Sequence, residues 1–315
     1  MQAYAIDAFG DPGTVRELPI PEPEEGRLRL RVAVAGLNPF DAAVLQGYLQ
    51  GRMEHRFPLI PGMDAAGTVD ALGDGVEGFA LGDRVFGSVG KPFLGAGTVA
   101  EFVTVSAGTV THTPLAMEDD VAAALPTAGV TGLLMADALA LSNGKTVVAV
   151  GATGGVGGYF LQLAVERGAS VVAVCRAENA DYARSLGAAD VIDYTADDVV
   201  AAVRTRFPDG IDAVADMHGD AEEVAKLSEL ISAGGHVASA VGVADVEALA
   251  ARSIEGTNVN GLVKTARLET LLGLVTAGTV VAPEIHPYPL ADAGEALATI
   301  GSSHVRGKIV VRVES

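Results

Sequence analysis

Cysteine is almost absent from this chain, because Cys175 is the only one among 315 residues. This excludes an internal disulfide framework and a cysteine-rich structural zinc lobe. Positive charge is also scarce: 21 lysines and arginines stand against 40 acidic residues, giving a formal net charge of −19 at pH 7. Such a charge argues against nucleic acid or an anionic membrane as the main partner, and any phosphate-binding basic patch must be local.

Targeting and membrane signals are lacking as well. The first seven residues contain no basic region followed by an apolar core, so we expect no signal peptide and a cytoplasmic location. Residues 121–141 are almost wholly apolar, but a proline, two glycines and Asp137 interrupt the run. We therefore predict a pair of buried helices here, and no membrane span.

The chain is long enough for two domains, and 49% hydrophobic residues support a large core. The first part reads as short strands separated by glycine-rich turns, which favours an irregular β-barrel. The expected strands are Leu28–Leu37, Ala65–Asp70, Asp83–Phe86 and Thr98–Val105.

From about residue 119 apolar strands alternate with helices, a rhythm typical of an α/β fold with a parallel sheet covered on both faces. The expected strands are Thr146–Val150, Ser170–Cys175, Asp190–Asp193, Ala213–Asp216 and His236–Val241. The expected helices are Tyr159–Arg167, Asn179–Leu186, Ala196–Arg206, Ala221–Ile231 and, further on, Arg267–Ala277. We predict a doubly wound Rossmann domain over 119–259 and a β-rich domain over 1–118, to which 260–315 returns with a final strand over 307–313.

The segment Thr-Val-Val-Ala-Val-Gly-Ala-Thr-Gly-Gly-Val-Gly at 146–157 carries the main functional signal. A β-branched run stops in a glycine cluster, and a helical stretch follows. This order suits a dinucleotide pyrophosphate, because glycines allow a sharp turn and the helix N-terminus offers free N–H groups. The alternative is a glycine-rich loop without a ligand. We expect contacts to the cofactor from Ala152, Thr153, Gly154, Gly155, Val156 and Gly157.

The end of the next strand, Val174-Cys175-Arg176, distinguishes the two nicotinamide cofactors. An NAD site usually places an acid there to bind the ribose 2′-hydroxyl, whereas a guanidinium binds a 2′-phosphate. We therefore predict NADPH, with Arg176 binding the 2′-phosphate. Against this assignment, the acid Glu178 follows closely in the sequence, and Arg176 could be an ordinary solvated arginine. Cys175 is expected to pack against the adenosine pocket.

Several further motifs, together with the glycine loop, carry a family resemblance. They are Asn-Pro-Phe-Asp at 38–41, Pro-Gly-Met-Asp-Ala-Ala-Gly at 61–67, Gly-Asp-Arg-Val at 82–85, Ala-Leu-Pro-Thr-Ala-Gly-Val-Thr at 124–131, Leu-Gly-Ala-Ala-Asp-Val-Ile-Asp-Tyr at 186–194, Ala-Gly-Gly at 233–235 and Gly-Lys-Ile-Val at 307–310. In this order and spacing the chain resembles the medium-chain dehydrogenase/reductases, in their zinc-free quinone oxidoreductase branch.

The resemblance implies a groES-like catalytic domain, a Rossmann domain and a cleft between them. The zinc alcohol dehydrogenases carry Gly-His-Glu where this chain has Gly62-Met63-Asp64, and their first cysteine ligand has no counterpart near Asn38. A catalytic zinc needs three protein ligands, so we expect no metal. The histidines form no close ligand pair: His55, His112, His218, His236, His286 and His304.

The resemblance also implies catalytic candidates. Asn38 could bind a substrate oxygen or the nicotinamide ribose, although an asparagine before a proline also suits a turn. Asp41 lies near the active site by resemblance, and it could equally cap a helix or fix the loop. Tyr48 stands one place earlier than the proton-donating tyrosine of related enoyl thioester reductases, so donation, pocket lining and plain packing remain open.

Further cofactor contacts follow from the resemblance. Thr127 and Thr131 would lie near the nicotinamide, and Tyr194 near the 2′-phosphate. Backbone groups near the nicotinamide would come from Val241, Gly242, Asn260 and Gly261. A homodimer through an edge strand of the Rossmann sheet, around Asn258–Leu262, is also implied.

These observations favour a zinc-independent oxidoreductase that transfers hydride from NADPH to a small-molecule quinone or α,β-unsaturated carbonyl. One alternative is an enoyl thioester reductase, which would need a basic groove for a phosphopantetheine arm. The other is a non-catalytic NADPH-binding protein, either a redox sensor or a crystallin-like protein.

Overall fold

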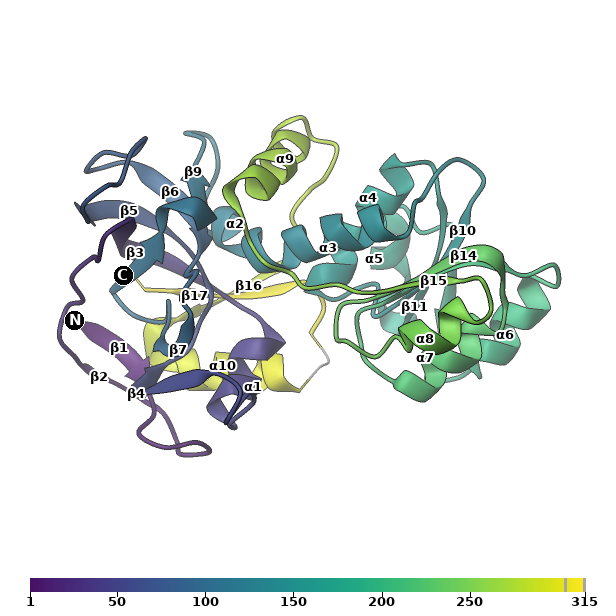
Figure 1. Ribbon diagram of the computed structural model, residues 1–315, viewed down its shortest axis with the longest axis horizontal. Coiled ribbons are helices and arrows are strands. Elements are labelled where there is room, and N and C mark those ends of the chain that lie inside the picture. The colour runs from purple at the N-terminus through teal and green to yellow at the C-terminus, as the bar shows by residue number, and fades with distance from the viewer. Residues whose placement is uncertain (303–304, 314–315) are drawn as a thin grey trace. The chain divides into compact units, whose positions relative to one another are not determined.

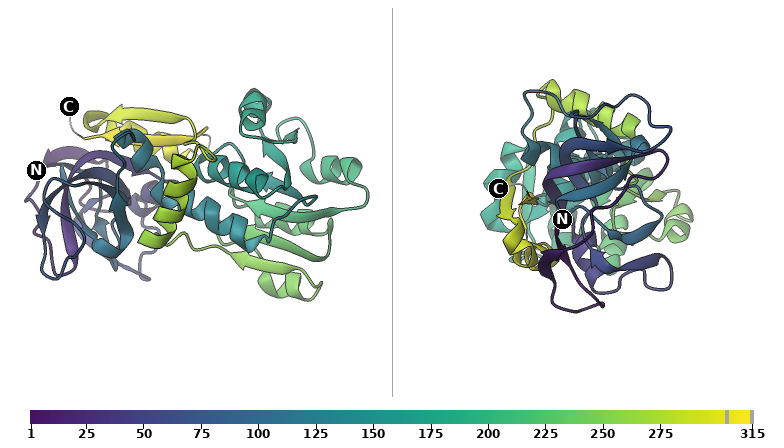
Figure 2. Two further views of the ribbon diagram at one scale, coloured as in Figure 1. Left: turned by 90° about the horizontal axis from the view of Figure 1, so that it is seen from above. Right: turned by 90° about the vertical axis from the view of Figure 1, so that its left-hand side faces the viewer.

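The computed structural model describes residues 1–302 and 305–313 of the chain. It divides into two compact units. Unit 1 contains Met1–Thr127, Val263–Gly273 and Glu284–Ser315, and unit 2 contains Ala128–Leu262 and Leu274–Pro283. The C-terminal strand β17 (Lys308–Arg312) thus lies in the same unit as the N-terminal strand β1 (Gln2–Ala5), yellow and purple in Figure 2.

The unit boundaries differ from the expected ones in three places: 119–127 belong to unit 1, and 260–262 and 274–283 belong to unit 2. Helix α2 (Asp119–Ala124) belongs to unit 1, where its Ala123 carbonyl lies so close to Gly36 that a Cβ there would be 2.1 Å away. The segment 274–283 belongs to unit 2, because Gln162 donates to the Val281 carbonyl at 2.9 Å and accepts from its N–H at 2.8 Å. Contacts between segments far apart in sequence thus place both α2 and 274–283.

Unit 1 is built on a curved sheet in the order β16-β17-β3-β5-β6-β9, with β8 paired to β3. Its strands are β3 (Arg27–Leu37), β5 (Asp64–Leu72), β6 (Arg84–Ser88), β8 (Phe102–Ser106), β9 (Val110–His112), β16 (Ile285–Pro289) and β17. Inward side chains of β3 alternate with outward ones, as in Leu28, Leu30 and Val32, and form the centre of the core. The strand expected from Thr98 starts only at Phe102.

Two small sheets and short helices complete unit 1. The strands β1 and β2 (Thr14–Glu17) pair antiparallel, and β4 (Glu54–Ile60) pairs with β7 (Phe93–Ala96). The helices are α1 (Pro39–Leu45), α2 and α10 (Ala293–Gly301), and α10 packs on α1. The loop between β6 and β7 and the start of α1 both border the candidate pocket.

Unit 2 contains the expected parallel sheet, in the order β12-β11-β10-β13-β14-β15. Its strands are β10 (Thr146–Val150), β11 (Ser170–Cys175), β12 (Asp190–Asp193), β13 (Ile211–Asp216), β14 (Ile231–Ser239) and β15 (Glu255–Asn258). The order reverses at β10, which is the switch point of a doubly wound sheet. Apolar side chains such as Val148, Val172 and Val214 fill its core.

Helices cover both faces of this sheet: α4 and α5 lie on one side, and α7 and α8 on the other (Figure 1). Their bounds are α4 (Gly155–Glu166), α5 (Ala180–Ser185), α6 (Val199–Arg206), α7 (Ala221–Ser228) and α8 (Val246–Ala250). Helix α9 (Thr265–Thr276) crosses the division between the units, and α3 (Pro126–Ala138) follows α2 directly. The apolar run 121–141 is therefore a helix pair, as expected, and no described helix is long and apolar enough to cross a membrane.

Candidate active site

The glycine loop of unit 2 has the geometry expected of a pyrophosphate site. Strand β10 ends at Val150, Gly151 turns the chain with φ of +78°, and α4 begins at Gly155, four residues before the expected start. A Cβ on Gly157 would lie 2.2 Å from the Gly151 carbonyl, so only glycine fits there. The first turn of α4 leaves backbone N–H groups available to an anion. Gly151, which was not among the expected cofactor contacts, makes the turn.

A second loop pair at the same sheet edge is fixed by two buried residues that sequence reasoning missed. The Asp216 carboxylate at the end of β13 accepts from the N–H groups of His218 and Gly219, at 3.0 and 2.9 Å. It also accepts from the Ser239 hydroxyl at 2.7 Å, and that hydroxyl oxygen accepts from the N–H of Val241 at 3.2 Å. This network holds the loops after β13 and β14 in place. Asp216 ends an expected strand, which was the available signal, whereas Ser239 lies inside the expected strand 236–241 and ends β14 only in the structure.

Arg176 and Tyr194, both expected near a 2′-phosphate, lie side by side. The Arg176 Nε donates to the Tyr194 hydroxyl at 3.0 Å, at the ends of the neighbouring strands β11 and β12. Both side chains are partly exposed and can reach a ligand. Two acids stand nearby: a Glu178 oxygen lies 3.9 Å from the guanidinium, and the charge of Asp193 also acts on it. A 2′-phosphate would therefore meet one arginine and the hydroxyl of Tyr194 beside two carboxylates.

Cys175 is a buried packing residue. Its side chain is 2% exposed, and burial raises the pKa of its thiol to about 11. The thiolate, which is the reactive form, is scarce at neutral pH. A redox role is thereby disfavoured.

Unit 1 contains a buried polar network around Asn38, at the junction of β3 and α1. The Lys308 ammonium donates to the Leu37 carbonyl at 2.6 Å and to the Asn38 side-chain oxygen at 2.8 Å. The Asn38 amide nitrogen in turn donates to Asp64 at 2.9 Å. Asp64 also accepts from the backbone N–H and the hydroxyl of Thr127, at 3.0 and 2.6 Å. Four segments far apart in sequence, β3, β5, β17 and the start of α3, are thus tied together.

The protonation of this network is set by burial. Lys308 is 2% exposed and Asp64 is fully buried, so desolvation lowers the pKa of the lysine and raises that of the aspartate, while their mutual attraction opposes both shifts. Asp41, 2% exposed, accepts from the Asn38 N–H at 2.8 Å. Burial raises the pKa of Asp41 to about 7, and the nearby charge of Asp64 adds to the effect. Neither Lys308 nor Asp64 was singled out from the sequence as a site residue.

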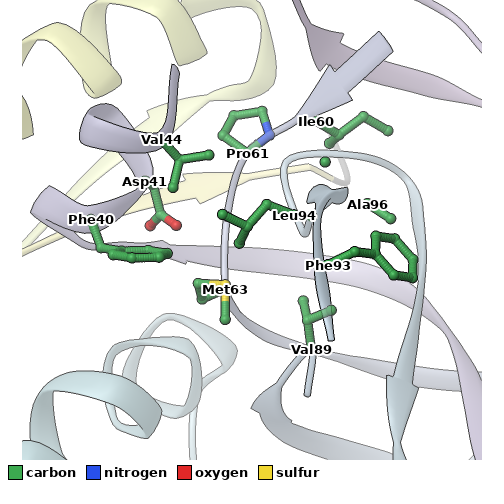
Figure 3. A pocket seen from close by; sticks show the side chains of 13 residues that line it. Phe40, Asp41, Val44, Ile60, Pro61, Met63, Val89, Phe93, Leu94 and Ala96 are labelled. Atoms are coloured by element: carbon green, nitrogen blue, oxygen red, sulfur yellow. The ribbon is translucent and has the colours of Figure 1, made fainter. Parts of the chain in front are cut away.

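A small pocket of about 20 Å³, lined mainly by apolar side chains and partly open to solvent, lies beside this network. Figure 3 shows Phe40, Asp41 and Val44 on one side and Phe93 and Ala96 on the other. Asp41 contributes the one ionisable side chain of the described lining. Met63, which replaces the histidine of the zinc alcohol dehydrogenases, also lines the pocket, as do Ile60, Pro61, Gly62, Val89, Leu94, Gly95 and Gly97. Such a wall offers apolar contacts to a molecule that lies against it.

The remaining predicted residues are spread over both units. Tyr48 is 52% exposed and packs its ring edge-on against Phe40 at 5.9 Å, and it does not line the described pocket. Thr127 hydrogen bonds within unit 1, whereas Thr131 and Thr153 are buried in unit 2. Around the loops after β14 and β15, Val241 and Asn260 are exposed, Gly242 has φ of +83° and Gly261 is half-buried. Their contacts to a cofactor remain predictions.

The residues present do not fit a catalytic zinc ion. Over residues 1–302 and 305–313, no group of three His, Cys, Asp or Glu side chains is placed to hold a metal. His304 lies outside the described residues. His55 and His286 hydrogen bond to backbone carbonyls, and His112 to the Asp83 carboxylate.

Comparisons with known proteins agree with this arrangement. A family model described as alcohol dehydrogenase GroES-like domain matches residues 24–115, and one described as zinc-binding dehydrogenase matches 186–311. The chloroplast envelope quinone oxidoreductase homolog of Arabidopsis thaliana is 30% identical over 99% of this chain and 98% of its own length. An NADPH-dependent alkenal/one oxidoreductase of the same plant is 29% identical, over 99% of this chain and 79% of its own. The solved quinone oxidoreductase of Coxiella burnetii superposes with a TM-score of 0.91 at 27% identity, covering 100% of this chain and 99% of that one.

The chain therefore belongs to the medium-chain dehydrogenase/reductase superfamily and, within it, to the quinone oxidoreductase branch. It is an oxidoreductase that uses a nicotinamide cofactor.

Proposed function

We propose that this protein is a zinc-independent reductase that transfers hydride from NADPH to quinones or α,β-unsaturated carbonyl compounds. The apolar pocket with Met63 in its wall carries the proposal. Met63 stands where the zinc alcohol dehydrogenases have a histidine ligand, and the described residues contain no group of three His, Cys, Asp or Glu that could hold a metal. We therefore infer an acceptor that is already electrophilic and needs no Lewis acid. The names of the relatives, which include quinone and alkenal/one oxidoreductases, support the same class of acceptor.

The residues of unit 2 fit a dinucleotide. The turn at Gly151 and the N-terminus of α4 would hold the pyrophosphate, and the loops fixed by Asp216 and Ser239 would border the cofactor. Arg176 and Tyr194 would hold the 2′-phosphate, which favours NADPH over NADH. When bound, NADPH supplies a hydride, and reduction of a quinone to its hydroquinone takes up one further proton.

The residues of unit 1 would position the acceptor and manage that proton. Because Asp41 titrates near neutrality in the wall of the pocket, its carboxyl group can hold a proton next to a bound carbonyl oxygen. The amide oxygen of Asn38 accepts from Lys308 and its amide nitrogen donates to Asp64. We therefore assign Asn38 the role of fixing the start of α1, which presents Phe40 and Asp41 to the pocket. Tyr48 is half exposed and does not line the described pocket. We therefore propose that it contacts an acceptor only where that molecule extends out of the pocket.

Steady-state oxidation of NADPH and NADH by the purified protein tests the function. The acceptors are 9,10-phenanthrenequinone, 1,4-benzoquinone, an alkenal and crotonyl-CoA, and zinc is measured in the same preparation. The proposal expects turnover with a quinone or the alkenal, preference for NADPH, and no loss on chelation. Turnover with crotonyl-CoA alone would favour an enoyl thioester reductase, and tight NADPH binding without any turnover would favour a sensor or crystallin-like protein.

We also propose a cytoplasmic homodimer that takes small molecules as substrates, without nucleic acid or membrane partners. A single buried cysteine fits a reducing compartment. Strand β15 forms the edge of the parallel sheet in unit 2, and an edge strand can pair with a second copy. This edge ends at Asn258, so most of the expected segment 258–262 follows the strand. Light scattering of the purified protein measures the assembly.

A further inference from the structure

Positive charge gathers at one end of the apolar pocket, in a chain that has little of it. Phe93 lines the pocket, and two cations face its ring: the Arg56 guanidinium carbon lies 3.5 Å from the ring centroid and the Lys91 ammonium 5.6 Å. The same ammonium lies 3.4 Å from the carbonyl oxygen of Ala96, another lining residue. The cations therefore stand directly at the pocket wall.

Two cations at this place, Lys91 and Arg27, have no direct carboxylate partner among the described residues. Lys91 has the Ala96 carbonyl as its hydrogen-bond acceptor and forms no ion pair in the described part of the chain. Arg27 behind it is 9% exposed and donates only to the carbonyls of Val89, Gly90 and Thr104, and its Nε is buried without an acceptor. A buried cation without a counter-ion is costly, so an anion brought by a ligand would be bound strongly.

The neighbouring charges leave this site positive. Arg27 and Arg56 both act on Lys91, and Glu24 is the acid whose charge reaches it. Burial, with the like charge of Arg27, lowers the pKa of Lys91 to about 8, so the ammonium form still dominates at pH 7. Arg56 is paired with Glu54 at 2.7 Å and is half exposed. Lys91 is thus the cation best able to take an additional oxyanion.

We propose that Lys91, supported by Arg27 and Arg56, forms a subsite for an anionic group of the substrate, whose apolar electrophilic part lies against the pocket wall formed by Phe40, Met63 and Leu94. The ligand is therefore an amphipathic acceptor: an unsaturated ketone or quinone that carries an oxyanion, either a carboxylate or a phosphate. This inference rests on the proposed function, since it names the substrate class of the same site.

The test compares an unsaturated keto acid with its methyl ester, which has nearly the same shape but no charge. We expect wild type to favour the acid in kcat/KM. Lys91→Met should lower kcat/KM for the acid by about tenfold or more, as for the loss of a charge-assisted hydrogen bond, and change that for the ester less than about twofold. Lys91→Arg should restore most of the preference. Lys226→Met, which removes an exposed lysine paired with Glu222 in unit 2, is the matched control and should leave both substrates unchanged.

Two further measurements distinguish a carboxylate from a phosphate as the anion, and separate the subsite from the proposed function. If Lys91→Met lowers turnover of crotonyl-CoA but not of the keto acid, the subsite holds and its anion is a phosphate. Binding of the saturated acid and ester, measured by equilibrium dialysis, gives the same comparison without turnover. Equal effects of Lys91→Met on acid and ester, or none on the acid and on crotonyl-CoA, would overturn the subsite. If the subsite fails but wild type still reduces the ester, the proposed function stands. If wild type reduces none of the acceptors, the proposed function fails, and the dialysis result still decides whether the subsite exists.

Discussion

Replacing Lys308 with methionine tests the buried network on which the geometry of unit 1 depends. The substitution keeps much of the side-chain volume but removes the ammonium that donates to Leu37 and Asn38. Two acceptors then lose a donor in a buried site, and the carboxylates of Asp64 and Asp41 lose the cation that attracts them. Removing one member of a buried charge network destabilises by about 3–5 kcal/mol, and we expect a loss of that size in the free energy of unfolding of unit 1.

Urea denaturation followed by far-UV circular dichroism measures this loss, because the chain has no tryptophan to report on unfolding. The deficit of Lys308→Met should shrink at acid pH, where a protonated Asp64 no longer needs a cation. Lys226→Met removes an exposed ion pair and should change the stability by less than about 1 kcal/mol. If Lys308→Met stays within about 1 kcal/mol of wild type at pH 7, the reasoning about the network is refuted.

Two further predictions concern titration and cofactor choice. The pKa of Asp41 is raised by folding from 3.8 to about 7, so its protonation stabilises the fold at low pH, and this contribution is lost as the pH rises through about 7. The stability of wild type should therefore fall more steeply between pH 4 and 7 than that of Asp41→Asn, and parallel slopes in the two denaturation series would contradict the assignment. Arg176→Glu should weaken NADPH binding by at least about tenfold and NADH binding far less, as measured by titration of each cofactor. Arg184→Glu, an exposed arginine paired with Asp181, is the control, and equal losses for both cofactors would remove Arg176 from the 2′-phosphate site.

The parallel sheet could be predicted from the sequence because its strands are continuous apolar runs. Strands such as β10 and β11 have their expected bounds, and their order follows from the rules for right-handed crossovers. The ends of helices were harder to predict where glycines intervene. Helix α4 starts at Gly155 because its first turn is the glycine loop itself, whose composition conceals a helix.

The candidate site was predictable where its residues are neighbours in sequence, and less so where they are not. The glycine loop lies in one segment, and its backbone geometry follows from its composition. Lys308 and Asn38 are separated by 270 positions, and no local pattern indicates that they meet. The same holds for Lys91 and Arg56, which flank one ring through the pairing of two short strands. Long-range contacts of this kind become visible only in the folded chain.

The most direct test of the central claim is NADPH oxidation by chelator-treated protein in the presence of 9,10-phenanthrenequinone. We predict turnover that depends on the quinone, that is undiminished by removal of metal ions, and that is higher with NADPH than with NADH. Loss of activity on chelation with recovery on added zinc, or no turnover of any quinone or enone by protein that binds NADPH tightly, would contradict the account.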